Sequence, residues 1–186
     1  MAHSIELLLD SRTDTAIRAA WQALADAGLP SQVNVKSATN RPHITLLAAQ
    51  RISPEVDEVL RGLAPRLPID CVVGGHVVFG GPVFGAPVFG GPRLTLARLI
   101  VPSEELLALH AEVFRLALPH VTGQPFAHCR PGHWTAHATL GRRLTAIEVG
   151  AALGLAEEVA PDLAAEVVAL RRWDSDARTD HLLIAG

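Results

Sequence analysis

Two tetrapeptides in this sequence carry the same residue types: HITL begins at His43 and HATL begins at His137. Alternate residues of a β-strand point to the same face, so each tetrapeptide would present one imidazole and one hydroxyl together, with Thr45 beside His43 and Thr139 beside His137. Imidazoles can take a proton from an attacking oxygen and give one to a departing oxygen near neutral pH. Hydroxyls can donate hydrogen bonds to phosphate oxygens. These residues therefore predict in-line cleavage of a phosphodiester, with the histidines as acid and base and the threonines as phosphate ligands.

Arginines near both tetrapeptides could complete a phosphate site, because a guanidinium fits a phosphate with a planar fork. Arg142 and Arg143 follow the second tetrapeptide, and Arg41 precedes the first. In an unbroken strand, alternation would put Arg143 on the face of His137 and turn Arg142 away, although Gly141 would permit a twist that changes this. No carboxylate is close to either tetrapeptide in sequence, so neither a magnesium site nor another cofactor is expected.

The elements that must hold these motifs alternate between apolar strands and amphipathic helices. Strands are expected at 4–10, 43–50, 69–79, 93–101, 135–143, 165–173 and 181–186. Helices are expected within 11–30, 53–68, 103–118 and 145–161, with Ser11 or Thr13 capping the first and Ser103 the third. Each half of the chain runs strand, helix, loop, motif strand, helix and strand. This weak internal repeat predicts an α+β protein with two similar lobes.

The domain organisation follows from this repeat. We expect a single bilobal domain over 1–186, with lobe-like halves at about 1–77 and 93–186, whose motif strands line one central cleft if the lobes face each other. The joint at 78–92 repeats VFGGP, VFGAP and VFGGP. Its Gly and Pro content favours a long hairpin loop, and the alternative is a mobile flap with Phe79, Phe84 or Phe89 covering a substrate base.

Composition narrows the class of protein further. The 186 residues are 49% hydrophobic and carry a net charge of −3, which suits a globular chain without a broad nucleic-acid surface. Acidic residues are absent from 27–54, 71–103 and 113–147, which suggests a local anion site or simply strands and loops with few acids. No membrane span, no secretory signal and only two cysteines are present in the sequence, so a cytoplasmic setting is expected.

With its two His-X-Thr-Leu motifs on a repeated arrangement of strands and helices, the chain resembles the two-histidine (2H) phosphoesterases. This family includes bacterial 2'-5' RNA ligase-like proteins and cyclic phosphodiesterases. The resemblance implies antiparallel lobes with helices packed outside, and metal-independent chemistry on 2',3'-cyclic or 2'-5'-linked phosphates of a nucleotide or RNA terminus, reversible as ligation. It also favours Arg142, since the second motif of that family is often followed by an arginine two residues past the leucine. Where relatives commonly carry an aromatic residue after the first motif, this chain reads HITLLAAQ, so Trp134 or Phe126 is expected to contact the base.

Other interpretations compete with this one. The chain could be a non-catalytic nucleotide- or RNA-binding module with the same cleft, and a monomer is expected in either case. A loose cluster could hold zinc, although its spacing matches no standard pattern: His120, His128, Cys129 and His133. Arg171 and Arg172 are interpreted as part of a solvated rim of the protein surface, with binding of a phosphate as the less favoured alternative.

Overall fold

The computed structural model describes residues 2–80, 93–156 and 162–185, and within them the chain is a mixed α+β structure with four α-helices. The strands are His3–Leu9 (β1), Ile44–Ala49 (β2), Arg51–Ile52 (β3), Ile69–Phe79 (β4), Leu94–Ile100 (β5), Val121–Thr122 (β6), His137–Leu144 (β7), Leu163–Asp174 (β8) and Thr179–Ala185 (β9). The α-helices are Ser11–Asp26 (α1), Val56–Arg61 (α2), Glu104–Ala117 (α3) and Ala146–Ala156 (α4). Short 3-10 helices are Gln32–Asn34 (η1), Ala64–Arg66 (η2), Leu118–His120 (η3) and Ala127–Cys129 (η4). The expected α+β class is confirmed, while most of the 78–92 repeat, including Phe84 and Phe89, lies outside the described residues.

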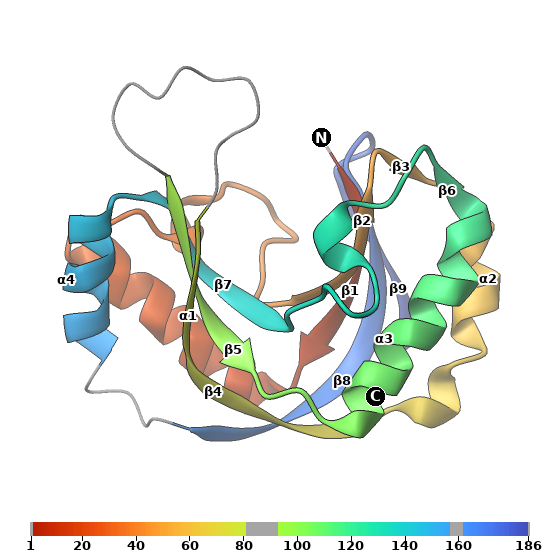
Figure 1. Ribbon diagram of the computed structural model, residues 1–186, viewed down its shortest axis with the longest axis horizontal. Coiled ribbons are helices and arrows are strands. Elements are labelled where there is room, and N and C mark those ends of the chain that lie inside the picture. Colours follow the sequence, from red (N-terminus) through yellow and green to blue (C-terminus); the bar gives the residue numbers. More distant parts are fainter. Residues whose placement is uncertain (1, 81–92, 157–161, 186) are drawn as a thin grey trace.

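One antiparallel sheet of seven strands organises the molecule. Its order is β2-β1-β8-β4-β5-β7, and β9 also pairs with β8. The strands of this sheet follow a U in Figure 1, with β8 and β4 along the bottom. The motif strands β2 and β7 end the order, yet they have Cα atoms within 8 Å of each other. The sheet therefore bends until its two ends meet, which brings the two motifs together.

Strands from the two sequence halves are interleaved in this sheet. β4 belongs to the first half and pairs with β5 and β8 of the second half, while β8 also pairs with β1 of the first half. The twelve-residue β8 is long enough to pair with β4 along its first half and with β9 along its second half. The hydrogen-bonded strands around the first motif are thus β2-β1-β8-β9, and those around the second motif are β4-β5-β7. The division of the chain into lobe-like halves at 1–77 and 93–186 stays a prediction.

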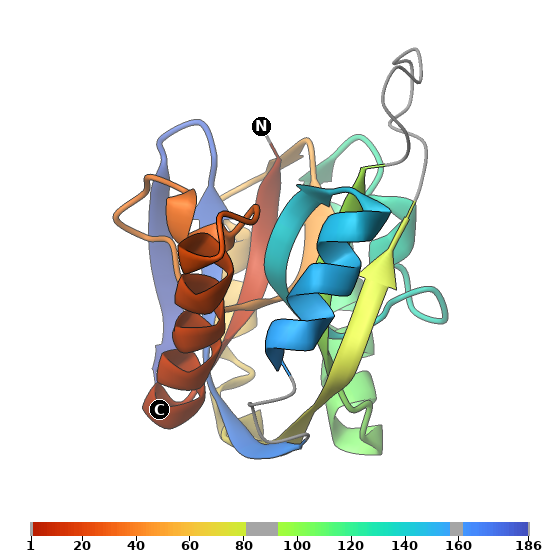
Figure 2. The ribbon, with the colours of Figure 1, turned by 90° about the vertical axis from the view of Figure 1, so that its left-hand side faces the viewer.

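Two pairs of helices flank the sheet, with α1 beside α4 and α2 beside α3 (Figure 1 and Figure 2). α1 is capped by Asp10, whose carboxylate accepts a 2.9 Å hydrogen bond from the backbone N–H of Thr13, and not by Ser11 or Thr13. Asp10 is a stronger cap here because both of its oxygens reach Thr13, one at the backbone and one at the hydroxyl. The expected cap of α3 is confirmed, since the hydroxyl of Ser103 accepts from the N–H of Leu106 at 3.1 Å.

Two further expectations concern the described residues as a whole. None of their helices has the length and apolar character needed to cross a membrane. Cys71 and Cys129 are buried free thiols, so they form no disulfide, and burial raises the pKa of Cys71 to about 11.

Candidate active site

The two motif strands have the alternating exposure that their sequences predict. In each motif the histidine and threonine are half-buried and share one face of the strand. The residues between them are fully packed into the core: Ile44, Leu46, Ala138 and Leu140 are each at most 3% exposed. The core side chains therefore fix the strands, and the polar side chains are left on the face that can receive a substrate.

Both motif histidines are oriented by the same local hydrogen bond. Nδ1 of His43 lies 2.8 Å from the carbonyl oxygen of Arg41, and Nδ1 of His137 lies 2.7 Å from that of Thr135. A carbonyl oxygen only accepts hydrogen bonds, so Nδ1 must carry the proton in each ring. Nε2 is then the atom that can gain or lose a proton in both histidines, as an acid–base pair requires.

The register of β7 decides which arginine accompanies the second motif. Thr139 pairs with Ala97 of β5, and Arg142 pairs with Thr95. Between these two pairs the chain advances by two residues on β5 and by three on β7. The extra residue forms a β-bulge, which returns the side chain of Arg142 to the face of Thr139. Arg143 has a φ of 66°, in the left-handed region, and has no partner in the β5 register. The strand is not unbroken, so the alternation that favoured Arg143 does not apply.

Replacing Arg142 by alanine is expected to lower kcat/KM for a phosphodiester substrate by about 10–100-fold, because a hydrogen bond to a charged group contributes about 1.5–3 kcal/mol. Arg143→Ala is the matched control, since it removes the same charge from the neighbouring exposed position and is expected to cost less. Steady-state kinetics of the two variants make the comparison, and a larger loss in Arg143→Ala would reverse the assignment.

His137 lies in a positively charged and partly desolvated setting. Burial lowers the pKa of its imidazole, and the charges of Arg142, His43 and His128 act in the same direction, against the hydrogen bond to Thr135. The ring of Phe79, at the end of β4, packs against it with centroids 4.6 Å apart. His137 is therefore disposed to be neutral at neutral pH and so able to accept a proton.

His43 lies beside a buried carboxylate that sequence reasoning missed. Oε1 of Glu6, on β1, is 3.6 Å from Nε2 of His43. Burial by itself would raise the pKa of Glu6, but the charges of His43 and Arg171 and hydrogen bonds from Ser4 and Arg171 hold that pKa below its usual value. Glu6 is therefore ionised at neutral pH. The available signal was the one acid in the strand SIELLL, at a position that alternation places on the opposite face from the core-facing residues Ile5 and Leu7.

The arginines that follow one another on β8 are buried, so their interpretation as a solvated rim is wrong. Arg171 is 3% exposed and Arg172 is 1% exposed. Arg171 binds Glu6 through Nε, at 2.8 Å, and Arg172 binds Asp57 of α2 through Nε and Nη2. Alternate positions of β8 face opposite sides of the sheet, and each guanidinium is matched by a carboxylate on its own side.

Each motif strand accepts a hydrogen bond from one tryptophan that belongs to the other half of the chain. Nε1 of Trp21, in α1, donates to the carbonyl of Thr139 at 2.9 Å, and Nε1 of Trp134 donates to the carbonyl of Thr45 at 2.8 Å. The strands β2 and β7 end the sheet order, and these indoles satisfy backbone carbonyls of the motif threonines. The ring of Trp134 also stacks on His110 at 4.0 Å, so this residue has a structural role besides its predicted contact with a base.

The other predicted substrate contacts take different positions. Phe126 is 42% exposed and lies near the ring of His128, at a centroid distance of 5.9 Å. Nε of Arg41 is 3.6 Å from a carboxylate oxygen of Asp14 in α1, while its carbonyl orients His43. Their contacts with substrate stay predictions.

The loop residues considered as a zinc cluster are not brought together. Within the described parts of the chain, one group of three potential metal ligands has its ligand atoms within 4.8 Å of one another: His3, Asp174 and Asp176. It contains none of the four loop residues. Cys129 is buried, and burial raises the pKa of its thiol, which disfavours the thiolate that zinc requires.

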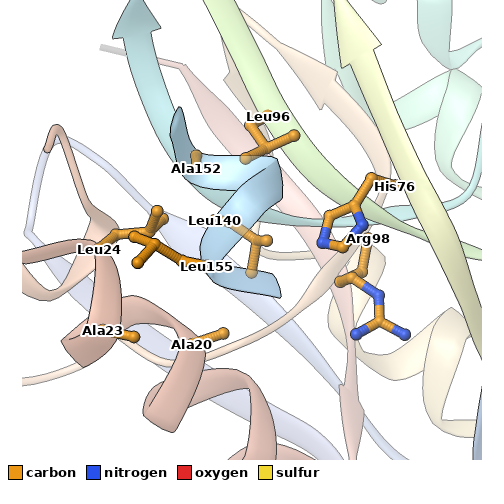
Figure 3. A pocket seen from close by; sticks show the side chains of 9 residues that line it. All are labelled: Ala20, Ala23, Leu24, His76, Leu96, Arg98, Leu140, Ala152 and Leu155. Carbon is orange, nitrogen blue, oxygen red and sulfur yellow. The ribbon is translucent and has the colours of Figure 1, made fainter. Parts of the chain in front are cut away.

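A small cavity lies between α1, α4 and the strands β4, β5 and β7, where it touches the core-facing Leu140 of the second motif (Figure 3). Its volume is about 30 Å³, which accommodates one or two water molecules and no nucleotide. Apolar side chains line most of it, and His76 and Arg98 lie together at one side. Burial lowers the pKa of His76, and the charge of Arg98 adds to this effect.

Comparisons with known proteins identify the family of the chain and the fold that it shares. A family model described as the 2'-5' RNA ligase superfamily matches residues 11–179. The fold is similar to that of Usb1 from Kluyveromyces marxianus, with a TM-score of 0.51 and 14% identity over 98% of this chain and 97% of that one. The same protein with uridine monophosphate gives a TM-score of 0.51 and 13% identity over the same shares of the two chains. LigT from E. coli gives a TM-score of 0.45 and 17% identity over 97% of this chain and 92% of that chain.

Comparison with curated protein sequences gives no match. The family model nevertheless covers nearly the whole chain and includes both motifs. The chain therefore belongs to the 2'-5' RNA ligase superfamily, a group of two-histidine phosphoesterases.

Proposed function

We propose that this protein is a metal-independent phosphodiesterase that acts on 2',3'-cyclic or 2'-5'-linked phosphates of nucleotides or RNA ends. His43 and His137 would be its acid–base pair, and Thr45, Thr139 and Arg142 would bind the non-bridging phosphate oxygens. One histidine removes a proton from the attacking water as its oxygen bonds to phosphorus. The other donates a proton to the oxygen whose bond to phosphorus breaks.

One observation carries most of this proposal. In both motif histidines Nδ1 donates a hydrogen bond to a backbone carbonyl oxygen, so Nε2 is the atom that can gain or lose a proton. The threonine two residues later presents its hydroxyl on the same face. This geometry supports proton transfer by two histidines at one phosphate. The similarity of the fold to Usb1, which has been solved with uridine monophosphate, supports a nucleotide phosphate as the substrate class.

Incubating the protein with each of the four 2',3'-cyclic nucleotides and with a 2'-5'-linked dinucleotide, with and without EDTA, tests the proposal. We expect turnover that survives the chelator, because proton transfer and hydrogen bonding need no metal ion in this scheme. Chromatography of the products identifies which bond is broken. Loss of turnover in EDTA that is restored by added metal would contradict metal-independent chemistry.

The same experiment separates an enzyme from a binding module. Tight binding of these nucleotides by calorimetry, with no product from any of them, would favour the non-catalytic nucleotide- or RNA-binding alternative. Incubating RNA ends that carry a 2',3'-cyclic phosphate with 5'-hydroxyl ends tests ligation, since the transfer is reversible in principle. A monomer acting in the cytoplasm remains our expectation for the protein itself.

A further inference from the structure

The two motif strands are held by equivalent frameworks, which allows their polar surroundings to be compared position by position. β1 pairs with β2 as β5 pairs with β7, and in both pairs a register shift follows the motif threonine. Thr45 faces Glu6 on β1, whereas Thr139 faces Ala97 on β5. One strand further, Glu6 faces Arg171 on β8. At the equivalent place beside the second motif, Ala97 faces Val77 on β4. Two buried charges therefore accompany the first motif where the second has an apolar pair.

The difference continues on the motif strands themselves. Arg142 lies three residues after Thr139 and shares its face, because of the bulge described above. The equivalent position after Thr45 is Ala48, which is buried. The second motif thus has an arginine where the first has alanine, and the first has a glutamate where the second has alanine. The two histidines therefore lie in similar backbone frameworks, but a carboxylate lies beside His43 and an arginine lies beside His137.

Glu6 is held in one place by a network of hydrogen bonds. Ser4 donates to Oε1 at 2.6 Å, and Arg171 donates to Oε2 from Nε at 2.8 Å. Arg171 is itself fixed by Nη1, which donates to Asp180 at 2.9 Å and to the carbonyl of Thr39 at 3.0 Å. Glu6 is 4% exposed, so solvent does not screen its charge from the imidazole next to it.

We propose that Glu6, held by Arg171, is a positioning residue that keeps the second proton on His43, so that His43 is the proton donor and His137 the proton acceptor in hydrolysis. The distance of 3.6 Å between Oε1 and Nε2 is too long for a hydrogen bond. The carboxylate therefore acts through its charge and leaves the Nε2 proton available to the substrate. This inference rests on the proposed phosphodiesterase function and assigns the two roles that the function leaves open.

The charged groups around each histidine agree with this assignment. His43 lies beside Glu6 of β1, and Glu6 is paired with Arg171 of β8. His43 also interacts electrostatically with His137 of β7. Three groups act on His137: Arg142 of its own strand, His43 directly before β2, and His128 of η4. All three are cationic or can become so. During hydrolysis Nε2 of His137 takes the proton of the attacking water, and Nε2 of His43 gives its proton to the departing alkoxide. His137 then releases the proton that it took to solvent, and His43 regains a proton from solvent.

Glu6→Gln removes the charge and keeps one of the two oxygens, which can accept a hydrogen bond from Ser4 or from Arg171. In the pH profile of kcat/KM, the high-pH limb reports loss of the proton from the acid, and the low-pH limb reports protonation of the base. The variant is expected to move the high-pH midpoint down by about one unit, the size expected for loss of a nearby opposite charge, and to leave the low-pH midpoint in place. Movement of the low-pH limb instead would make His43 the base and overturn the inference.

Asp57→Asn is the matched control. It neutralises the carboxylate that binds the neighbouring buried arginine, Arg172, on the other side of the sheet. It is expected to destabilise the protein as Glu6→Gln does, but to leave both pH midpoints unchanged. A shift of the same size in Asp57→Asn would show that lost stability, and not the charge of Glu6, moves the profile.

A measurement that needs no turnover separates this inference from the proposed function. Titration of the histidine Cε1–H resonances by NMR, assigned with His43→Ala and His137→Ala, should show the midpoint for His43 falling by about one unit in Glu6→Gln. An unchanged His43 titration would overturn the inference even if the enzyme is active. Absence of turnover by the unsubstituted protein would overturn the proposed function, and the titration would still test the coupling between Glu6 and His43.

Discussion

Alanine at His43 or at His137 is expected to lower kcat on a 2',3'-cyclic nucleotide by about 10²–10⁴-fold, because each substitution removes one of the two proton transfers. The double variant is expected to lose less than the product of the two single effects, since both groups serve one transfer. Steady-state rates at saturating substrate measure these losses. The pH profile of each single variant should keep only the limb that belongs to the remaining histidine.

His133→Ala is the control for this experiment. His133 is exposed and lies only four residues before His137, so it tests whether loss of any nearby imidazole matters. We expect its kcat to remain near that of the unsubstituted protein. Thermal unfolding of all variants checks that the fold is retained. If either His43→Ala or His137→Ala hydrolysed the substrate at the normal rate, the assignment of the pair would be wrong.

The second large effect is expected from Gly141→Ala, directly after the second motif. A Cβ atom at this position would clash with the carbonyl oxygen of Pro30 and would lie 3.2 Å from Cδ1 of Leu144. The backbone at Pro30 cannot yield easily, because the next residue, Ser31, donates to the carbonyl of Trp21 at 2.6 Å. Trp21 in turn binds β7, so the added methyl group would force apart segments that are bonded to each other.

We expect Gly141→Ala to lower the free energy of unfolding by about 2–3 kcal/mol, as overpacking of a filled site does. The unfolding midpoint in urea measures this loss. Activity should fall as well, since Thr139 and Arg142 lie on either side of the displaced residue.

Gly150→Ala makes the same chemical change where space is available. A Cβ atom at Gly150, within α4, would meet no atom within 4 Å. Alanine is a better helix former than glycine, so this variant is expected to gain about 0.5–1 kcal/mol. The two substitutions should therefore have opposite signs. Equal urea midpoints for Gly141→Ala and the unsubstituted protein would mean that Pro30 and β7 do not approach each other as closely as described.

The sequence by itself determined the features that depend on local backbone geometry. A strand has a side-chain period of two whatever it pairs with, so the face shared by His43 and Thr45, and by His137 and Thr139, was predictable. Helix caps and apolar helical spacing act within a few residues, which is why α3 and its Ser103 cap were predicted correctly. The resemblance of the motifs to the 2H phosphoesterases is likewise confirmed by the match to the 2'-5' RNA ligase superfamily.

Only the tertiary structure decided which residues surround those motifs. The choice between Arg142 and Arg143 depends on a bulge, and a bulge is defined by the partner strand β5. Glu6 is 37 residues before His43 in sequence, and Arg171 is 128 residues after it, so no local pattern links them. They meet because β1 lies between β2 and β8. Strand order and register depend on burial summed over the whole chain, and this long-range choice gives two similar motifs different electrostatic surroundings.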